Sequence, residues 1–179
     1  MGGGVRFSYP VWDYTRLYLR FNYDRSDVYD ILESAAESIK DLEGINTTAS
    51  VTSSLVYDDR DRLFNTTEGS NHRLSVQYAG FGGNIAFTKY LVETGWYLPL
   101  FWGLTEFLHA EGGYVSENPG GNLPDYERFY LGGMNSIRGF DYRDIYVLDE
   151  NGDEIGGDKY VQFNFEILIP LLKDQGLVG

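Results

Sequence analysis

Residues 127–142, ERFYLGGMNSIRGFDY, carry the most distinctive side-chain chemistry in the sequence. The stretch fits neither the alternation of a strand nor the spacing of a helix. Its notable residues are Gly132, Gly133, Ile137, Arg138, Gly139 and Phe140. Glycines let a backbone turn tightly and approach a neighbour closely, and a guanidinium can bind a carboxylate through two parallel hydrogen bonds. We therefore predict a bent loop whose arginine needs an acidic partner.

Other stretches offer no comparable chemistry. The segment DENGDEIGGD, which starts at Asp149, has Glu154 and Tyr160 where a calcium loop of the EF-hand type needs a glycine and an acid. A hairpin turn at Asn151-Gly152 explains this segment better. The 2 histidines lack metal-ligand spacing, and no phosphate loop or nucleophile motif is present. We expect no metal, no cofactor and no enzymatic activity.

Composition narrows the class of protein. The 14 basic residues face 27 acidic ones, and a net charge of −13 makes nucleic acid a poor partner. The 15 Tyr, 11 Phe, 3 Trp and 22 Gly favour an all-β fold, and the absence of cysteine rules out disulfides. The sequence contains neither a long apolar run nor a secretory signal, so we expect the chain to start inside a larger protein.

Alternation of apolar and polar residues recurs in segments close to the length that a tilted strand needs to cross a bilayer. These segments are 4–10, 15–24, 49–57, 73–81, 85–98, 105–115 and 160–169, and 176–179 offers the start of another strand. The polar faces carry Arg, Lys, Glu, Gln and Asn, which suit a water-filled lumen better than a packed core. We predict an antiparallel transmembrane β-barrel segment of about seven to eight strands, in contact with a lipid bilayer.

The connections between these segments alternate between short and long, except that 58–71 is long on the expected periplasmic side. Apolar residues at helical spacing predict one loop helix over about 27–42, with Asp27 able to cap its start and Gly44 able to end it. The longest loop, 116–158, contains the Arg138 triplet. Because outer-membrane barrels have short periplasmic turns and long external loops, we expect the helix and this loop on the outer side.

In combination, three motifs resemble the BamA-type outer-membrane protein assembly factor family, and the loop helix over 27–42 is a fourth, more variable feature of the resemblance. Residues 137–140 match the family's (V/I)RGF signature, and ERFYLGG at 127–133 precedes it as in the family. The strand YVQFNFEILIP places Glu166 where family members carry an acidic residue that faces the lumen. The third motif resembles the family's YDxRDxxxxPxxG periplasmic turn, although its proline is absent. The matching residues are Tyr57, Asp58, Arg60, Asp61 and Gly69.

The resemblance spans nearly all of residues 1–179 and implies the middle part of a larger barrel, with the POTRA domains and the terminal strands outside this chain. It implies that the signature loop folds back into the barrel, where Arg138 docks against Glu166. In that arrangement Gly132, Gly133 and Gly139 would approach the wall. Phe140 and Tyr142 would supply an apolar anchor.

The function implied is non-enzymatic, ATP-independent assembly and insertion of β-barrel proteins in the bacterial cell outer membrane. The implied partners are the outer-membrane lipid bilayer, nascent outer-membrane proteins and, in the full-length protein, accessory assembly lipoproteins. Three alternatives stay open: a two-partner secretion transporter of the same superfamily, a passive porin, and a soluble β adhesin. A solvated loop with an incidental Arg-Gly-Phe triplet is the simplest competing interpretation of 137–140.

Overall fold

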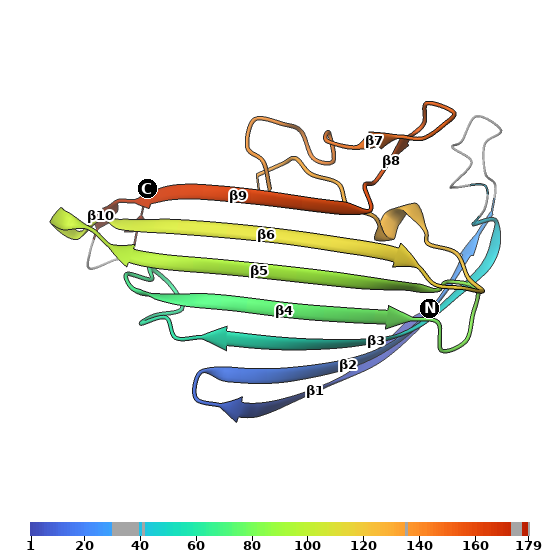
Figure 1. Cartoon of the computed structure of the whole chain (residues 1–179), viewed down its shortest axis with the longest axis horizontal. Coiled ribbons are helices and arrows are strands. Elements are labelled where there is room, and N and C mark those ends of the chain that lie inside the picture. The colour runs from blue at the N-terminus through green and yellow to red at the C-terminus, as the bar shows by residue number, and fades with distance from the viewer. Residues whose placement is uncertain (30–39, 41, 135, 173–176, 179) are drawn as a thin grey trace.

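The computed structural model describes residues 1–29, 40, 42–134, 136–172 and 177–178. Its main element is an antiparallel sheet in the order β1-β2-β3-β4-β5-β6-β9 (Figure 1). The strands are β1 (Gly2–Trp12), β2 (Thr15–Val28), β3 (Gly44–Asp58), β4 (Gly69–Ala79), β5 (Phe87–Pro99), β6 (Thr105–Glu117) and β9 (Lys159–Leu168). Each overlaps one predicted segment, so the all-β antiparallel prediction is confirmed.

Short elements complete the described fold. Two 3-10 turns, η1 (Phe101–Gly103) and η2 (Asp125–Glu127), lie in connections, and β7 (Val147–Leu148) pairs with β8 (Glu154–Ile155) around the Asn151-Gly152 turn. Leu177–Val178 (β11) pairs with Pro170–Leu172 (β10) instead of extending the main sheet as an eighth strand. None of the helical segments in the described residues is long and apolar enough to cross a membrane.

The predicted loop helix over 27–42 is wrong at its start. Asp27 and Val28 belong to β2 and pair with Ile45 and Gly44, because the β2–β3 ladder continues past the end of the clear alternation. Gly44 therefore begins β3, with a positive φ of 92°. Residues 30–39 and 41, which make up most of the predicted helix, lie outside the described residues.

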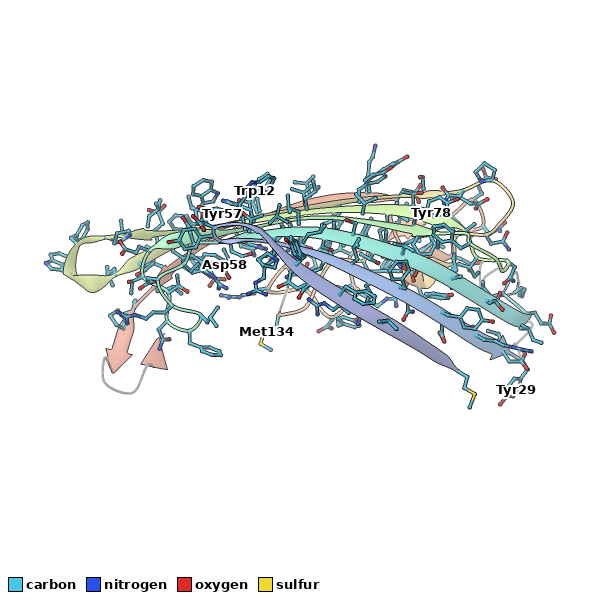
Figure 2. The ribbon with its side chains drawn as sticks, turned by 90° about the horizontal axis from the view of Figure 1, so that it is seen from below. Trp12, Tyr29, Tyr57, Asp58, Tyr78 and Met134 are labelled. Atoms are coloured by element: carbon cyan, nitrogen blue, oxygen red, sulfur yellow. The ribbon has the colours of Figure 1, made fainter. Side chains whose placement is uncertain are left out.

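The register divides the sheet into two faces. Apolar side chains such as Phe7, Val92 and Phe163 point outward and are 57%, 51% and 79% exposed. So large an apolar surface is typical of a strand wall that faces lipid. Figure 2 shows the sheet curved, with Tyr57 and Tyr78 on its convex side and Met134, from the loop between β6 and β9, on its concave side.

A small apolar core lies at one end of the sheet. Leu42, Ala79, Ile85, Phe87 and Val115 are buried there, and Val28, Leu123 and Phe129 pack against them. Leu123 and Phe129 come from the connection between β6 and β9, which begins after Glu117. Packing in this core thus holds the long loop between β6 and β9 against the strands.

Candidate functional site

The loop over residues 118–158 is hydrogen-bonded to the concave face of β9. Arg138 Nη2 donates to Glu166 Oε1 at 2.6 Å, and Ser136 Oγ donates to Gln162 Oε1 at 2.9 Å. Asn164 Nδ2 also donates to the carbonyl oxygen of Ser136, at 3.3 Å. Because Gln162, Asn164 and Glu166 alternate along β9, all three point to the same face as the loop. The structure therefore brings Arg138 and Glu166 together, although the Arg138 side chain remains 70% exposed.

The loop glycines permit close backbone contacts. A Cβ at Gly132 would lie 2.3 Å from the carbonyl oxygen of Asp141, so only glycine fits there. The amide of Gly133 donates to the carbonyl of Phe140 at 3.0 Å and closes the turn that presents Arg138. Gly139 has a φ of 95° and open space around it, and Ile137 is half-buried. The loop glycines thus permit the tight turn around Arg138. They do less to bring the loop close to the strands of the barrel wall.

The apolar anchor of the loop is Phe129, which corrects the prediction of Phe140 and Tyr142. Those two rings are 50% and 83% exposed, whereas Phe129 packs against the buried cluster. The Phe129 ring centroid lies 4.7 Å from that of Tyr160, and Lys89 Nζ lies 5.0 Å from the same Phe129 centroid. Phe129 is the anchor because the chain passes close to the buried core at this residue. The Arg-Gly-Phe triplet gives no sign of where the chain meets the core.

A glycine in the wall makes room for this anchor. A Cβ at Gly113 on β6 would lie 2.6 Å from Phe129 Cζ and 2.5 Å from Tyr160 Cε1. Glycine inside a strand often marks such a close approach. The pair Gly112-Gly113 within an otherwise alternating segment was therefore a signal that sequence reasoning missed.

A second cluster, also missed from sequence, holds the middle of the loop. The Arg143 guanidinium lies 3.6 Å from the ring centroid of Tyr130, and its Nη2 lies 3.6 Å from Asp125 Oδ2. Burial raises the pKa of Tyr130, and the hydrogen bond from its hydroxyl to Asp125 raises the pKa further. Asp125 Oδ1 also accepts a hydrogen bond of 2.8 Å from the amide of Gly156. The loop is thus folded on itself as well as on the wall.

The wall below the loop is acidic. Glu93 on β5 and Glu111 on β6 are register partners on the concave face. Glu111 accepts hydrogen bonds from the Tyr160 hydroxyl and from Gln162 Nε2, the latter at 3.1 Å. Glu93 faces His109 Nε2 at 3.4 Å. Together with Glu166, these carboxylates make the wall surface under the loop negatively charged.

The turn between β3 and β4 carries the motif that resembles the family's YDxRDxxxxPxxG periplasmic turn. Asp58 holds Arg60 by two hydrogen bonds, to Nε at 2.8 Å and to Nη2 at 2.7 Å. Hydrogen bonding and charge from Asp58 raise the pKa of Arg60 above its ordinary value. Tyr57 donates its hydroxyl to Asp59 Oδ2 at 2.9 Å, a contact that the motif did not predict.

Two further aspartates close this turn. Asp59 Oδ1 accepts from the amide and the hydroxyl of Ser70 at 2.6 and 2.8 Å, while Asp61 accepts from the amide and the hydroxyl of Thr67 at 2.9 and 2.7 Å. Burial alone would raise the pKa of Asp59 and of Asp61, but these hydrogen bonds hold both below their ordinary values. Gly69 has a φ of 108°, and a Cβ there would lie 2.7 Å from Arg60 Cα. The turn is therefore compact without the proline of the family pattern.

Comparison with known proteins places these features in a family. Residues 1–179 match the Omp85 superfamily domain. The chain is 36% identical over 182 residues to the outer membrane protein assembly factor BamA of Nitratidesulfovibrio vulgaris, which covers 99% of this chain and 23% of that protein. It is 26% identical over 173 residues to the sorting and assembly machinery component 50 homolog of Homo sapiens. That match covers 95% of this chain and 36% of the human protein. The chain thus spans well under half the length of either relative.

A solved structure has the same fold. The crystal structure of BamA from Haemophilus ducreyi lacking POTRA domains 1-3 matches with a TM-score of 0.76 at 19% identity. The match covers 97% of this chain and 38% of that chain. The resemblance to BamA-type barrels inferred from the motifs is thereby confirmed.

Proposed function

This chain belongs to the Omp85 superfamily, and we propose that it is part of the barrel wall of an outer-membrane β-barrel protein assembly factor. The names of its relatives, an outer membrane protein assembly factor and a sorting and assembly machinery component, support this function. We place the protein in the bacterial cell outer membrane, with the lipid bilayer and nascent outer-membrane proteins as partners. Accessory assembly lipoproteins would bind the full-length protein.

The proposed activity is non-enzymatic and needs no ATP. An unpaired strand edge in hydrocarbon leaves backbone groups without hydrogen bonds, at several kcal/mol for each group, so pairing with a template edge is strongly favoured. A barrel that offers such an edge and perturbs the bilayer nearby can therefore promote insertion of a new strand. This segment would contribute wall, outer cover and the contact between Arg138 and Glu166.

The observation that carries the proposal is the loop docked on the concave face through Arg138 and Glu166. A passive porin needs an open lumen, whereas this loop covers part of the wall, so the porin alternative is disfavoured. A two-partner secretion transporter shares an Arg-Gly signature, but the Tyr57 to Gly69 turn and the named relatives favour assembly. The apolar convex face disfavours a soluble adhesin.

The test is to replace Arg138→Ala in the full-length protein and to measure the levels of outer-membrane proteins in cells that depend on it. We expect those levels to fall while the variant barrel still inserts. A matched control, Arg25→Ala, removes an arginine of β2 that points to the convex face of the sheet, away from the loop. It should leave the levels of outer-membrane proteins unchanged. Unchanged levels in Arg138→Ala cells would contradict the proposed role of the loop.

A further inference from the structure

The concave face carries opposite charges on its two halves. The loop covers the acidic half, which β5, β6 and β9 form. The other half is built by β1 to β4 and is basic, with Arg6, Arg16, Arg20 and Arg73 on the concave face by register. These arginines stand out in a chain with a net charge of −13.

Like charges are placed side by side on this basic half. Arg6 and Arg20 are direct cross-strand partners, an arrangement that destabilises a sheet unless an anion lies nearby. Farther along the sheet, Val56 of β3 pairs with Arg16 of β2 on one side and with Arg73 of β4 on the other. Arg73 lies 3.7 Å from Glu93, but no carboxylate among the described residues lies within ion-pair distance of Arg6, Arg16 or Arg20. All three are exposed.

A polar hollow of about 450 Å³ lies among these arginines and extends to Lys89 of β5, and Arg16 is outside its lining. Its lining includes Arg6, Arg20 and Arg73 together with the hydroxyls of Tyr18, Ser54 and Ser75. Arg6 lies 4.5 Å from the Tyr18 ring centroid, and Ser54 and Ser75 hydrogen-bond each other at 2.8 Å. The hollow thus offers both positive charge and hydrogen-bonding groups.

The spacing of the charges indicates the shape of the ligand. Arg16 and Arg20 are four residues apart on β2, which is about 13 Å along a strand, and Arg16 and Arg73 lie two strands apart, about 10 Å. One phosphate or carboxylate could pair with the neighbouring Arg6 and Arg20, but it would leave Arg16, about 13 Å farther along the sheet, without a partner. An extended polypeptide can reach all three, because residues i, i+2 and i+4 share one face and span the same length.

We propose that this basic half of the concave face binds an extended acidic polypeptide segment of a protein under assembly. Carboxylates at alternate positions of that segment would pair with Arg6, Arg20 and Arg16 while the hydroxyls of the hollow contact its backbone. The proposal rests on the proposed function, which supplies a polypeptide partner. It adds the chemistry of the recognised segment and the strands that recognise it.

The test measures binding of a fluorescent nonapeptide of alternating Thr and Asp to the full-length protein in phosphatidylcholine nanodiscs. We expect this peptide to bind at least about tenfold more tightly than the same peptide with Asn for Asp, and its affinity to fall as salt is raised. The double variant Arg6→Gln/Arg20→Gln should weaken binding about fivefold. The control Arg25→Gln, on the opposite face of β2, should not change it.

Equal binding of the Asp and Asn peptides would overturn the proposal, and this comparison needs no variant that might misfold. Displacement by inorganic phosphate beyond the effect of sodium chloride at the same ionic strength would also overturn it, because the site would then hold a small anion. A parallel client-insertion assay in vesicles of the same lipid separates the two hypotheses. Insertion without peptide binding contradicts this inference alone, whereas peptide binding without insertion contradicts the proposed function and the client as the source of the segment.

Discussion

Arg60 in the turn between β3 and β4 and Arg138 in the loop between β6 and β9 belong to the two sequence signatures, but their surroundings differ. Arg60 is 18% exposed, and its guanidinium makes two hydrogen bonds to Asp58, two residues away. Arg138 is 70% exposed and makes one hydrogen bond, to Glu166, which lies 28 residues away. The turn is a local structure closed by its own carboxylates, whereas the loop depends on contacts from distant strands.

This comparison predicts different sensitivities for the two regions. In the turn, each residue supports its near neighbours, so one change should disrupt the whole element. In the loop, Phe129, Arg143 and Arg138 act at separate places. Loss of the signature arginine should therefore leave most of the loop in place, and its importance should be functional more than structural.

The largest effect is expected from Gly69→Ala. The new methyl group would lie 2.7 Å from two backbone atoms, Arg60 Cα and Asp59 O, in a left-handed conformation. We expect a loss of about 3 kcal/mol in the free energy of unfolding. Gly152→Ala is the matched control, because its φ is 87° but nothing lies within 4 Å, and it should lose only about 1 kcal/mol. Urea unfolding of the full-length protein in detergent would measure both, and equal losses would show that the close contacts do not matter.

The next effect tests the anchor of the loop. Phe129→Ala removes a ring that packs on Tyr160 and on the buried cluster, and we expect a loss of about 2 kcal/mol. Tyr142→Ala removes a ring that is 83% exposed and should change the free energy of unfolding by less than about 0.5 kcal/mol. The same urea experiment decides between them. A larger loss for Tyr142→Ala would restore the anchor predicted from sequence.

The turn should also depend on pH. Because the folded pKa values of Asp59 and Asp61 lie below the ordinary 3.8, the ionised forms stabilise the turn above that pH. That stabilisation is lost as the pH falls from about 3.8 through the lower folded values. Hydrogen exchange at the Thr67 amide, corrected for its intrinsic rate, should lose about tenfold protection in this range. Asp61→Asn should abolish the pH dependence at Thr67, and a persistent dependence would assign it elsewhere.

Apart from the control Tyr142→Ala, the smallest structural effect is expected from Arg138→Ala. An exposed ion pair contributes about 1 kcal/mol or less, so the midpoint of urea unfolding should hardly move. The adjacent contact from Ser136 to Gln162 should keep the loop on the wall. A loss comparable to that of Phe129→Ala would show that Arg138 supports the structure of the loop as much as its apolar anchor does.

The sequence predicted the strands of the main sheet because alternation is a local property of each strand. It failed at 27–28, where Asp27 and Val28 continue β2 although the following apolar residues recur at helical spacing. It also led to Glu166 as the partner of Arg138, since the family resemblance fixes both positions. Local patterns and family motifs were sufficient for these features.

Contacts that depend on where the long loop lands could not be predicted in the same way. Phe129 is no more apolar than Phe140, and only the fold shows which ring meets the core. The pairing of Arg143 with Tyr130 and Asp125 joins residues whose distances depend on the turns between them. The basic half of the concave face became visible only when the register aligned arginines from separate strands.

Cross-linking in the membrane would show whether the loop lies on the acidic half of the concave face. This chain has no cysteine, and in a full-length protein whose other cysteines are replaced, Ser136→Cys with Gln162→Cys introduces a thiol pair at a contact that measures 2.9 Å between the native side chains. A control pair, Ser136→Cys with Ser75→Cys, joins the loop to the basic half instead. With a short thiol-reactive cross-linker on the full-length protein, we predict efficient linkage of residues 136 and 162 and little linkage of 136 and 75. Equal linkage of both pairs, or none at 162, would contradict the docked loop.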